Sequence, residues 1–257
     1  MGNPSGAKSD ETDKDNFLMK KDYFALSYNN KKGTPNWVSW RLTKADLGKA
    51  PRKPFHPDSD LPEGFKRITP SDYTGSGFDR GHMCPHSDRA KTNESSFATF
   101  VMTNMVPQSP QNNQKAWDQL ENYCRDLVLN QGKVCYIVDG PEGKGGVGRS
   151  GFRTTTPNGK VTVPAKTWKV VMVLDEDMAD PAMMTKDTHI RLIGVVVPND
   201  DRVGFEWAGF RTPVKKIEEL TGYKFFDKVP EKLIEPLKEE HDEVPIPPPV
   251  PIHHSGE

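Results

Sequence analysis

The chain has 257 residues, of which 34% are hydrophobic and 28% are charged, and its formal net charge is −1 at pH 7. This length and composition predict one domain with a sizeable core and terminal segments, rather than two full domains. No stretch approaches the roughly 18 consecutive apolar residues of a membrane-spanning helix, which argues against a membrane partner. The near-zero net charge does not by itself indicate a polyanionic partner.

The three cysteines, Cys84, Cys124 and Cys135, permit at most one intramolecular disulfide, so their number does not identify a redox compartment. Cys84 and His86 have a spacing that could begin a zinc site. No second pair of cysteines or histidines at ligand spacing follows in the sequence, so a zinc site is disfavoured.

The N-terminal part of the chain divides into a polar lead and the first strands. Residues 1–22 are polar and charged and lack the apolar segment of a secretory signal, so we predict a flexible lead. Residues 24–42 predict two short strands joined by a turn at residues 29–33. The expected organisation is therefore the lead, a folded domain at residues 23–230 and an acidic, proline-rich tail at residues 231–257.

Prolines and glycines recur from residue 48 to residue 77, which predicts a long surface loop rather than regular structure. Such loops often carry functional side chains. We expect this loop to bring Arg52 to a functional site, where its guanidinium could pair with an anion. Lys53, Lys66 and Arg67 are alternatives for that role.

Residues 78–83, which read Phe-Asp-Arg-Gly-His-Met, combine a histidine, an arginine and a glycine. Neutral imidazole titrates near working pH and can act as a general base. A guanidinium pairs with phosphate or carboxylate groups. This stretch therefore predicts a base, His82, held next to a negatively charged substrate.

An apolar run at residues 97–102 leads into residues 103–108, and at this length periodicity does not separate helix from strand. Beyond Pro110, residues 112–130 predict the clearest helix of the chain, closed by Gly132. At about 100° per residue, one face of this helix carries Asn113, Trp117, Leu120, Cys124, Leu127 and Val128.

Glu121 and Arg125 form an i,i+4 pair at the edge of that face. An edge position lines the crevice between a helix and its neighbour, whereas Asp118 and Asn122 are expected to point to water. The Asn113 amide oxygen near the helix start and the Glu121 carboxylate two turns later are groups that a hard divalent cation, or its bound waters, would use. An ordinary surface ion pair is the alternative for Glu121 and Arg125.

Three segments rich in β-branched residues, 134–138, 168–174 and 192–197, are bounded by turn residues and predict the strands of a central sheet. Residues 212–222 predict a short helix with a proline at its first position and a glycine at its end.

Residues 143–150, which read Gly-Lys-Gly-Gly-Val-Gly-Arg-Ser, nearly match the phosphate-binding Walker loop. Arg149 stands where that motif requires lysine, and a turn rather than a helix follows. We therefore reject nucleoside triphosphate binding and predict a mobile glycine loop. The loop begins a basic segment, residues 143–174, that is either a track for backbone phosphates or a solvated strand face. Its cations are Lys144, Arg149, Arg153, Lys160, Lys166 and Lys169.

The tail from residue 231 carries an excess of acidic residues, and residues 244–251 have polyproline II character. We predict that this tail is disordered and has no function of its own. A linker or a docking peptide is the alternative.

Three blocks of the sequence resemble the DNA/RNA non-specific endonuclease family, which carries a ββα-metal finger. They are Asp-Arg-Gly-His at residues 79–82, Thr-Asn-Met-Val-Pro-Gln at residues 103–108, and residues 112–121. All three occur in the family's order, which is far more specific than a lone four-residue match. The resemblance extends from about Tyr23 to Phe226. It implies an α+β fold, with a central, mainly antiparallel sheet flanked by helices and a finger that carries the active site.

The resemblance implies a metal-dependent, sequence-non-specific endonuclease that hydrolyses phosphodiester bonds of single- and double-stranded DNA and RNA. Its products would carry 5′-phosphate and 3′-hydroxyl ends. His82 would be the general base, and Asn113 would hold Mg²⁺ or Mn²⁺. Glu121 would orient the waters of that ion, and Arg80, the third residue of the catalytic group, would bind the phosphate.

The remaining site residues would bind substrate: Arg52, Arg125 and Asp79. The two arginines would contact phosphate, and Asp79 would fix Arg80 or the finger backbone. DNA and RNA would be bound through their phosphate backbones, and a protein inhibitor could be a further partner. The resemblance also favours a secreted or periplasmic enzyme, and the oligomeric state is open.

Two other classes of function fit the same residues. The chain could be a phosphodiesterase acting on another substrate class. It could also be a catalytically silent nucleic-acid-binding module of the same fold, although the intact His82, Asn113 and Glu121 argue against this.

Overall fold

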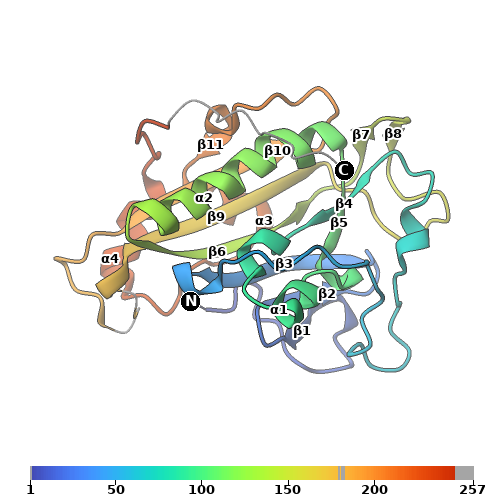
Figure 1. Ribbon diagram of the computed structural model, residues 1–257, viewed down its shortest axis with the longest axis horizontal. Helices are drawn as coiled ribbons and strands as arrows, with labels where there is room; N and C mark the ends of the chain where they lie inside the picture. The colour runs from blue at the N-terminus through green and yellow to red at the C-terminus, as the bar shows by residue number, and fades with distance from the viewer. Residues whose placement is uncertain (1, 179, 181–182, 247–257) are drawn as a thin grey trace.

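The computed structural model describes residues 2–178, 180 and 183–246, and its main feature is a seven-stranded sheet (Figure 1). The order across this sheet is β1, β2, β3, β6, β9, β10, β11. Each neighbouring pair is antiparallel, which confirms the predicted sheet. Its strands are β1 (Phe17–Lys20), β2 (Ala25–Asn29), β3 (Thr34–Leu42), β6 (Lys133–Glu142), β9 (Lys166–Asp175), β10 (Arg191–Pro198) and β11 (Arg211–Thr212).

The sheet separates two hydrophobic cores. Successive side chains of a strand point to opposite faces, and on β9 Val171 and Val173 lie in one core while Val170 and Met172 lie in the other. Helix α2 (Asp118–Asn130) covers the first face, and α3 (Val214–Thr221) and α4 (Glu231–Glu239) contribute to the second core. The strands β6, β9 and β10 include the three segments predicted from their β-branched residues, and α3 is the predicted short helix.

The second part of the fold is a small hairpin outside the main sheet. Strand β4 (Asp79–His82) pairs antiparallel with β5 (Met105–Gln108), and their connection contains α1 (Asn93–Ala98). A Cβ at Gly81 would overlap with Gln108 Oε1, so any larger residue here would force the Gln108 side chain to move. Together with α2 the two strands form the expected ββα unit.

The start of the long helix differs from the regular helix that we predicted. Residues Asn112–Trp117 form a π-helical turn that continues into α2. The buried Asn112 side chain donates hydrogen bonds to Thr167 Oγ1 (3.0 Å) and to the Pro198 carbonyl (3.1 Å), whereas Asn113 reaches toward β4. The two consecutive residues are thus anchored on different elements, and π turns are frequent at functional sites.

The predicted flexible lead is wrong for much of its length. Phe17–Lys20 forms β1 in the sheet, Ala7 is buried in the second core, and the Trp37 indole donates a hydrogen bond to Ser5 Oγ (2.8 Å). A few partners that are distant in the sequence therefore hold this polar segment in place. The composition of the segment itself gives no sign of such contacts.

The predicted disordered tail is also wrong where the structure describes it. Residues Glu231–Glu239 form α4, which buries Ile234 in the second core. Asp242 accepts hydrogen bonds from Arg191 at 2.8 Å and from Arg211 at 3.2 Å. The part of the polyproline segment beyond Ile246 lies outside the described residues.

The glycine loop is an ordered hairpin rather than the mobile loop that we expected. Strands β7 (Gly146–Gly148) and β8 (Gly151–Arg153) pair antiparallel, and no helix follows them directly, as the rejection of a Walker loop required. Among the helices of the described residues, none is long and apolar enough to cross a membrane.

Candidate active site

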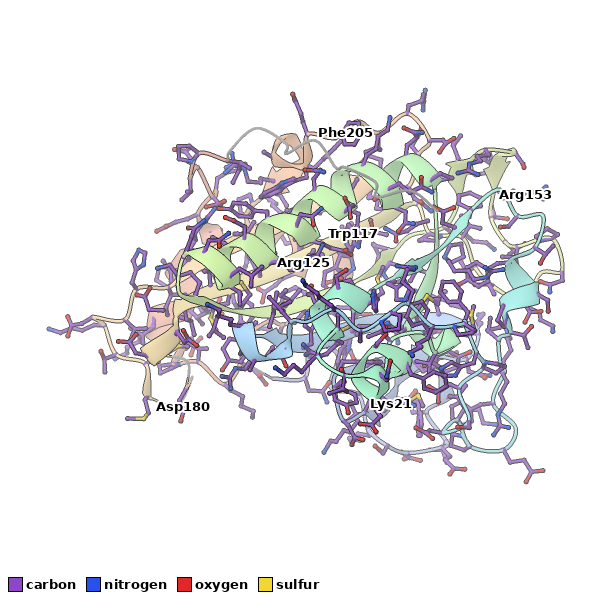
Figure 2. The ribbon with its side chains drawn as sticks, viewed as in Figure 1. Lys21, Trp117, Arg125, Arg153, Asp180 and Phe205 are labelled. Atoms are coloured by element: carbon purple, nitrogen blue, oxygen red, sulfur yellow. The ribbon has the colours of Figure 1, made fainter. Side chains whose placement is uncertain are left out.

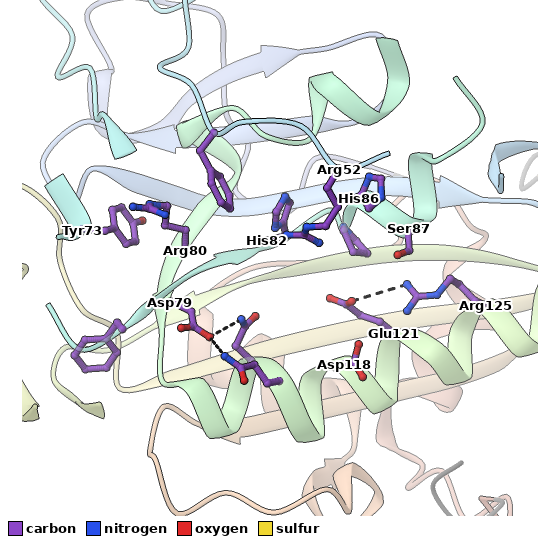
Figure 3. Close-up of a pocket in the computed structure, with 15 residues that line it drawn as sticks. Arg52, Tyr73, Asp79, Arg80, His82, His86, Ser87, Asp118, Glu121 and Arg125 are labelled. Atoms are coloured by element: carbon purple, nitrogen blue, oxygen red, sulfur yellow. Dashed lines mark hydrogen bonds and ion pairs between the residues drawn. The ribbon is translucent and has the colours of Figure 1, made fainter. Parts of the chain in front are cut away.

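The β4–β5 hairpin and α2 face each other across one open cleft of about 640 Å³. His82 lies on β4, and Asn113 lies on the turn before α2, so two separate elements bring them to a common space. Figure 3 shows His82 beside Arg52 and His86, with Asp118 and Glu121 on the helix opposite. Every residue predicted for the site lines this cleft: Arg52, Asp79, Arg80, His82, Asn113, Glu121 and Arg125.

The His82 ring is held by aromatic contacts. It lies 4.8 Å from the Phe100 ring centroid in an edge arrangement and 5.4 Å from that of Phe55, and its Nε2 is buried without a hydrogen-bond partner within the described residues. Burial, together with the nearby charges of Arg52 and His86, lowers the pKa of His82 to about 3. The imidazole is therefore neutral at neutral pH and able to accept a proton.

Asp79 orients the side chain of Asn113. The Asp79 Oδ2 accepts hydrogen bonds from Asn113 Nδ2 (2.9 Å) and from Gln114 Nε2 (2.7 Å). Since the amide nitrogen of Asn113 faces Asp79, its oxygen is directed elsewhere and is available to a ligand. We predicted that Asp79 fixes Arg80 or the finger backbone, whereas its carboxylate accepts hydrogen bonds from the two side-chain amides.

Glu121 is a half-buried residue at the edge of α2, the position that we predicted. Its side chain is 13% exposed and lies 3.9 Å from the Arg125 guanidinium. Burial raises the pKa of Glu121 to about 8, although Lys169 and Arg125 oppose this shift. In the metal-free protein the carboxyl is therefore largely protonated at neutral pH, and a cation brought into the cleft would favour its ionised form.

Arg125 is positioned by a residue that the sequence did not single out. Its Nη1 lies 2.8 Å from Asp88 Oδ1, and Asp88 Oδ2 accepts a hydrogen bond of 2.9 Å from the Trp40 indole. Asp88 is buried. The Arg125 guanidinium is thus fixed at the cleft by a carboxylate from the β4–β5 connection, and no sequence spacing indicates that contact.

A buried ion pair lies beneath Glu121. Lys169 Nζ is 2.6 Å from Asp139 Oδ2, and both side chains are at most 1% exposed. The ammonium lies 4.4 Å from the Trp117 ring centroid and 4.9 Å from that of Trp40. Burial alone would lower the pKa of Lys169, but Asp139 and Glu121 raise it. Lys169 is therefore a core residue, and its place in a surface basic segment was a wrong prediction.

The two arginines on the His82 side of the cleft lie over aromatic rings. The Arg52 guanidinium lies 5.3 Å from the Phe100 ring centroid, and that of Arg80 lies 5.2 Å from the Phe55 centroid. Arg80 Nε also donates to the Pro70 carbonyl (3.2 Å), which turns its side chain toward Tyr73 (Figure 3).

The alternatives to Arg52 make contacts elsewhere, so the long loop contributes Arg52 as expected. The Lys53 ammonium bonds to Asn93, that of Lys66 to the backbone of Lys31 and Lys160, and the Arg67 guanidinium to the backbone of Leu61.

His86 and Asp118 are among the cleft residues that were not predicted as part of the site. His86 follows His82 by four residues and also lines the cleft. Its Nδ1 is 3.0 Å from Ser96 Oγ. Asp118, which we expected to point to water, also lines the cleft. The short spacing from His82 to His86 is a signal in the sequence that the two histidines lie close together. From the sequence alone, we consider His86 only as a zinc ligand.

The donor groups of the cleft fit a hydrated divalent ion better than zinc. Within the part of the chain that the structure describes, no three His, Cys, Asp or Glu side chains are grouped to hold a metal. Cys84 is buried and unpaired, and burial raises its pKa. The cleft offers one oriented amide oxygen, on Asn113, and a buried carboxyl two turns away. Mg²⁺ often keeps most of its waters and takes only one or two protein ligands.

Known proteins resemble this chain along most of its length. The sequence model of the DNA/RNA non-specific endonuclease family matches residues 1–232, which includes the segment expected to be a lead. A nuclease of Nostoc sp. is 49% identical over 230 residues, covering 89% of this chain and 80% of that protein. The mitochondrial nuclease EXOG of Xenopus laevis is 32% identical over 223 residues, covering 83% of this chain but only 59% of that protein.

A solved structure supports the same comparison at the level of the fold. A chain in the crystal structure of the EndoG/EndoGI complex, which concerns EndoG inhibition, superposes with a TM-score of 0.70 at 26% identity. The superposition covers 84% of this chain and 88% of the other. It supports the α+β fold with a ββα-metal finger.

Proposed function

Because this chain belongs to the DNA/RNA non-specific endonuclease family and is therefore a hydrolase of nucleic-acid ester bonds, we propose that its cleft cleaves DNA and RNA with His82 as general base and Asn113 as metal ligand. The observation that carries this proposal is the convergence of these two side chains on one open cleft. We propose 5′-phosphate and 3′-hydroxyl product ends, single and double strands as substrates, and Mg²⁺ or Mn²⁺ as the metal.

His82 removes a proton from the attacking water. Its neutral state at neutral pH supports this role, although a pKa of about 3 makes it a weak base in the empty cleft. Burial is the main cause of that low value and Arg52 adds to it, so a phosphate that neutralises Arg52 raises the pKa by removing a smaller contribution. A well-placed general base contributes about 10²–10⁴-fold to the rate.

Asn113 presents its amide oxygen to the metal, and Asp79 holds the amide in that orientation. When bound, a divalent ion supplies Lewis acidity at the phosphate and an acidic water near the leaving oxygen. The ionised Glu121 accepts hydrogen bonds from waters in this part of the cleft and keeps them oriented.

The arginines neutralise the phosphate. Arg52 and Arg80 lie on the His82 side of the cleft and Arg125 on the helix side (Figure 3). Since such contacts are made to phosphate oxygens, they carry no base information. They are therefore consistent with cleavage that ignores sequence and accepts both DNA and RNA.

The test is plasmid cleavage with Mg²⁺ by the parent and by His82→Ala, with His86→Ala as the matched variant of the same cleft. We expect His82→Ala to lose at least about 100-fold in kcat while its affinity for DNA changes little, and His86→Ala to lose much less. Near-parent cleavage by His82→Ala would refute its assignment as the general base. A larger loss in His86→Ala than in His82→Ala would assign that role to His86 instead.

Substrate class and metal need two controls. EDTA should abolish cleavage. The cleavage rates restored by adding Mg²⁺ or Mn²⁺ to the EDTA-treated enzyme are then compared to identify the preferred metal. A parent enzyme that hydrolyses only small phosphodiesters would indicate another substrate class, and a parent that binds plasmid without cutting it would indicate a silent binding module.

Two further proposals concern partners and location. A structural relative is crystallised in a complex that concerns EndoG inhibition, which supports a protein inhibitor for this chain; co-purification with the native protein tests it. The secreted or periplasmic location stays a prediction, which fractionation of the native cells would test.

A further inference from the structure

The hairpin of β7 and β8 (Gly146–Arg153) lies next to the segment that enters the catalytic cleft. The Arg149 amide donates a hydrogen bond to the Gly77 carbonyl (3.0 Å), and a side chain at Gly77 would lie 2.7 Å from the Ser150 nitrogen. Phe78, the next residue, lines the cleft. The hairpin is therefore packed directly on the segment that leads into β4.

This hairpin holds an aromatic ring in solvent. Phe152 is 65% exposed. The tip of its ring occupies the space where a side chain at residue 145 would be, and Gly145 has a φ of +99° that favours glycine. The glycine-rich sequence thus lets the ring rest against the backbone, so Phe152 is restrained although it is exposed.

Cations accompany the ring. Arg149 is exposed. Arg153, labelled in Figure 2, is half-buried, and its Nε has no hydrogen-bond partner within the described residues. Neither guanidinium forms an ion pair with a carboxylate in the described ranges. In contrast, Lys160 and Lys169 of the same basic segment pair with Asp72 and Asp139. The positive charge that remains available in this segment therefore includes the two arginines of the hairpin.

We propose that the β7–β8 hairpin binds the nucleic-acid chain where it leaves the cleft, with Phe152 stacking on an unpaired base and Arg149 and Arg153 contacting phosphates. The proposal rests on the function proposed above. Exposed aromatic rings beside cations are the usual elements of single-strand binding, because every base has a π face and every nucleotide a phosphate. Bases in a duplex are already stacked, so the contact favours single-stranded DNA or RNA.

An exposed phenylalanine could also contact a protein. The flanking arginines and the continuity with the cleft favour a polyanion that is already bound at the active site. A protein partner would not need to follow the cleft wall.

The binding test uses the full chain with His82→Ala, so that substrate is not consumed, and measures the anisotropy of a fluorescent oligothymidylate. In this background, Phe152→Leu keeps an apolar side chain but removes the π face, and Phe152→Trp keeps it. We expect Phe152→Leu to weaken binding by about 5- to 150-fold, and Phe152→Trp to restore it. A duplex of equal length should respond far less. The control is Phe205→Leu, because Phe205 is also exposed but lies at a different part of the surface (Figure 2).

The charge contacts have a separate readout in the salt dependence. Each of Arg149→Ala and Arg153→Ala should reduce the slope of log K against log salt concentration by about 0.7 for a single strand. Arg41→Ala is the matched control, because Arg41 is exposed on β3 and lines a different cavity. Unchanged slopes in both hairpin variants would overturn the phosphate contacts.

Failure of this proposal is distinguishable from failure of the proposed function. With His82 intact, Phe152→Leu should raise KM for oligonucleotides while leaving hydrolysis of bis(p-nitrophenyl) phosphate, which is too small to reach the hairpin, at the parent rate. If the parent cleaves DNA and Phe152→Leu binds oligothymidylate as well as the parent, only the hairpin proposal falls. Loss of self-association in Phe152→Leu with unchanged nucleic-acid affinity would also overturn it, in favour of an interface between copies of this chain.

Discussion

Removing the charge of Lys169 should separate its contribution to stability from its contribution to the cleft. Lys169→Met keeps a side chain of similar length against the Trp40 and Trp117 rings but leaves Asp139 without its partner. The Oδ1 of Asp139 already has no hydrogen-bond partner in the described part of the chain, and Oδ2 would lose its 2.6 Å contact with Lys169. The variant therefore buries an uncompensated carboxyl.

The expected loss of stability follows from that burial. Removing one partner of a buried ion pair destabilises a protein by about 3–5 kcal/mol. For a domain of this size, each 1 kcal/mol lowers the melting temperature by about 2–4 °C, so Tm should fall by about 6–20 °C. Replacing both partners, in Lys169→Met/Asp139→Val, leaves no buried charge and should recover most of the loss.

The same variants should change the pH dependence of the reaction. Lys169 is the first of the charges that oppose the raised pKa of Glu121. Without Lys169, that pKa moves further above about 8, so the fraction of ionised Glu121 at a given pH falls. At subsaturating Mg²⁺, the rise of kcat/KM with pH should shift to higher pH in Lys169→Met and equally in the double variant, although the double variant is stable.

Thermal denaturation followed by circular dichroism, together with kcat/KM measured across pH, checks both parts. A parent-like Tm in Lys169→Met would show that the ion pair does not carry the stability assigned to it. A double variant with a parent pH profile would refute the electrostatic link between Lys169 and Glu121, whatever its stability.

Two more outcomes are expected. Glu121→Gln cannot ionise, so the rise of kcat/KM through about pH 8 at subsaturating Mg²⁺ should disappear, and an unchanged profile would assign that titration to another group. A chain ending at residue 230 loses α4 and the Arg191–Asp242 contact. It also loses the burial of Ile234, which contributes about 1.5–3 kcal/mol. Its Tm should be lower than that of a chain ending at Ile246, and equal values would mean that α4 adds no stability.

The central sheet could be predicted because its signal is local: strands β6, β9 and β10 are rich in β-branched residues that fill both cores. The gathering of His82 and Asn113 follows instead from the three motifs that resemble the endonuclease family. The amphipathic face of α2 also follows from its spacing, since its side chains pack on the sheet.

The features that the sequence did not predict depend on contacts between distant segments. The π turn at Asn112 is held by Thr167 and Pro198, and the position of Arg125 by Asp88. No periodicity encodes such pairs. The terminal segments were assigned as flexible on composition alone, whereas a few buried side chains and the ion pairs of Asp242 attach them to the sheet.

Residues 51–125 carry nine basic and nine acidic residues, yet two arginines of the cleft have no carboxylate partner among the described residues. Asp79 is engaged by the amides of Asn113 and Gln114, and Asp88 by Arg125. Glu121, with its pKa raised to about 8, adds little negative charge at neutral pH in the metal-free protein. Over the ranges that the structure describes, Arg52 and Arg80 have no carboxylate ion pair and line the cleft. A count of charges along the sequence gives each acidic residue the same weight. In the folded chain Asp79 orients two amides and Asp88 orients Arg125, so Arg52 and Arg80 remain available to bind a phosphate.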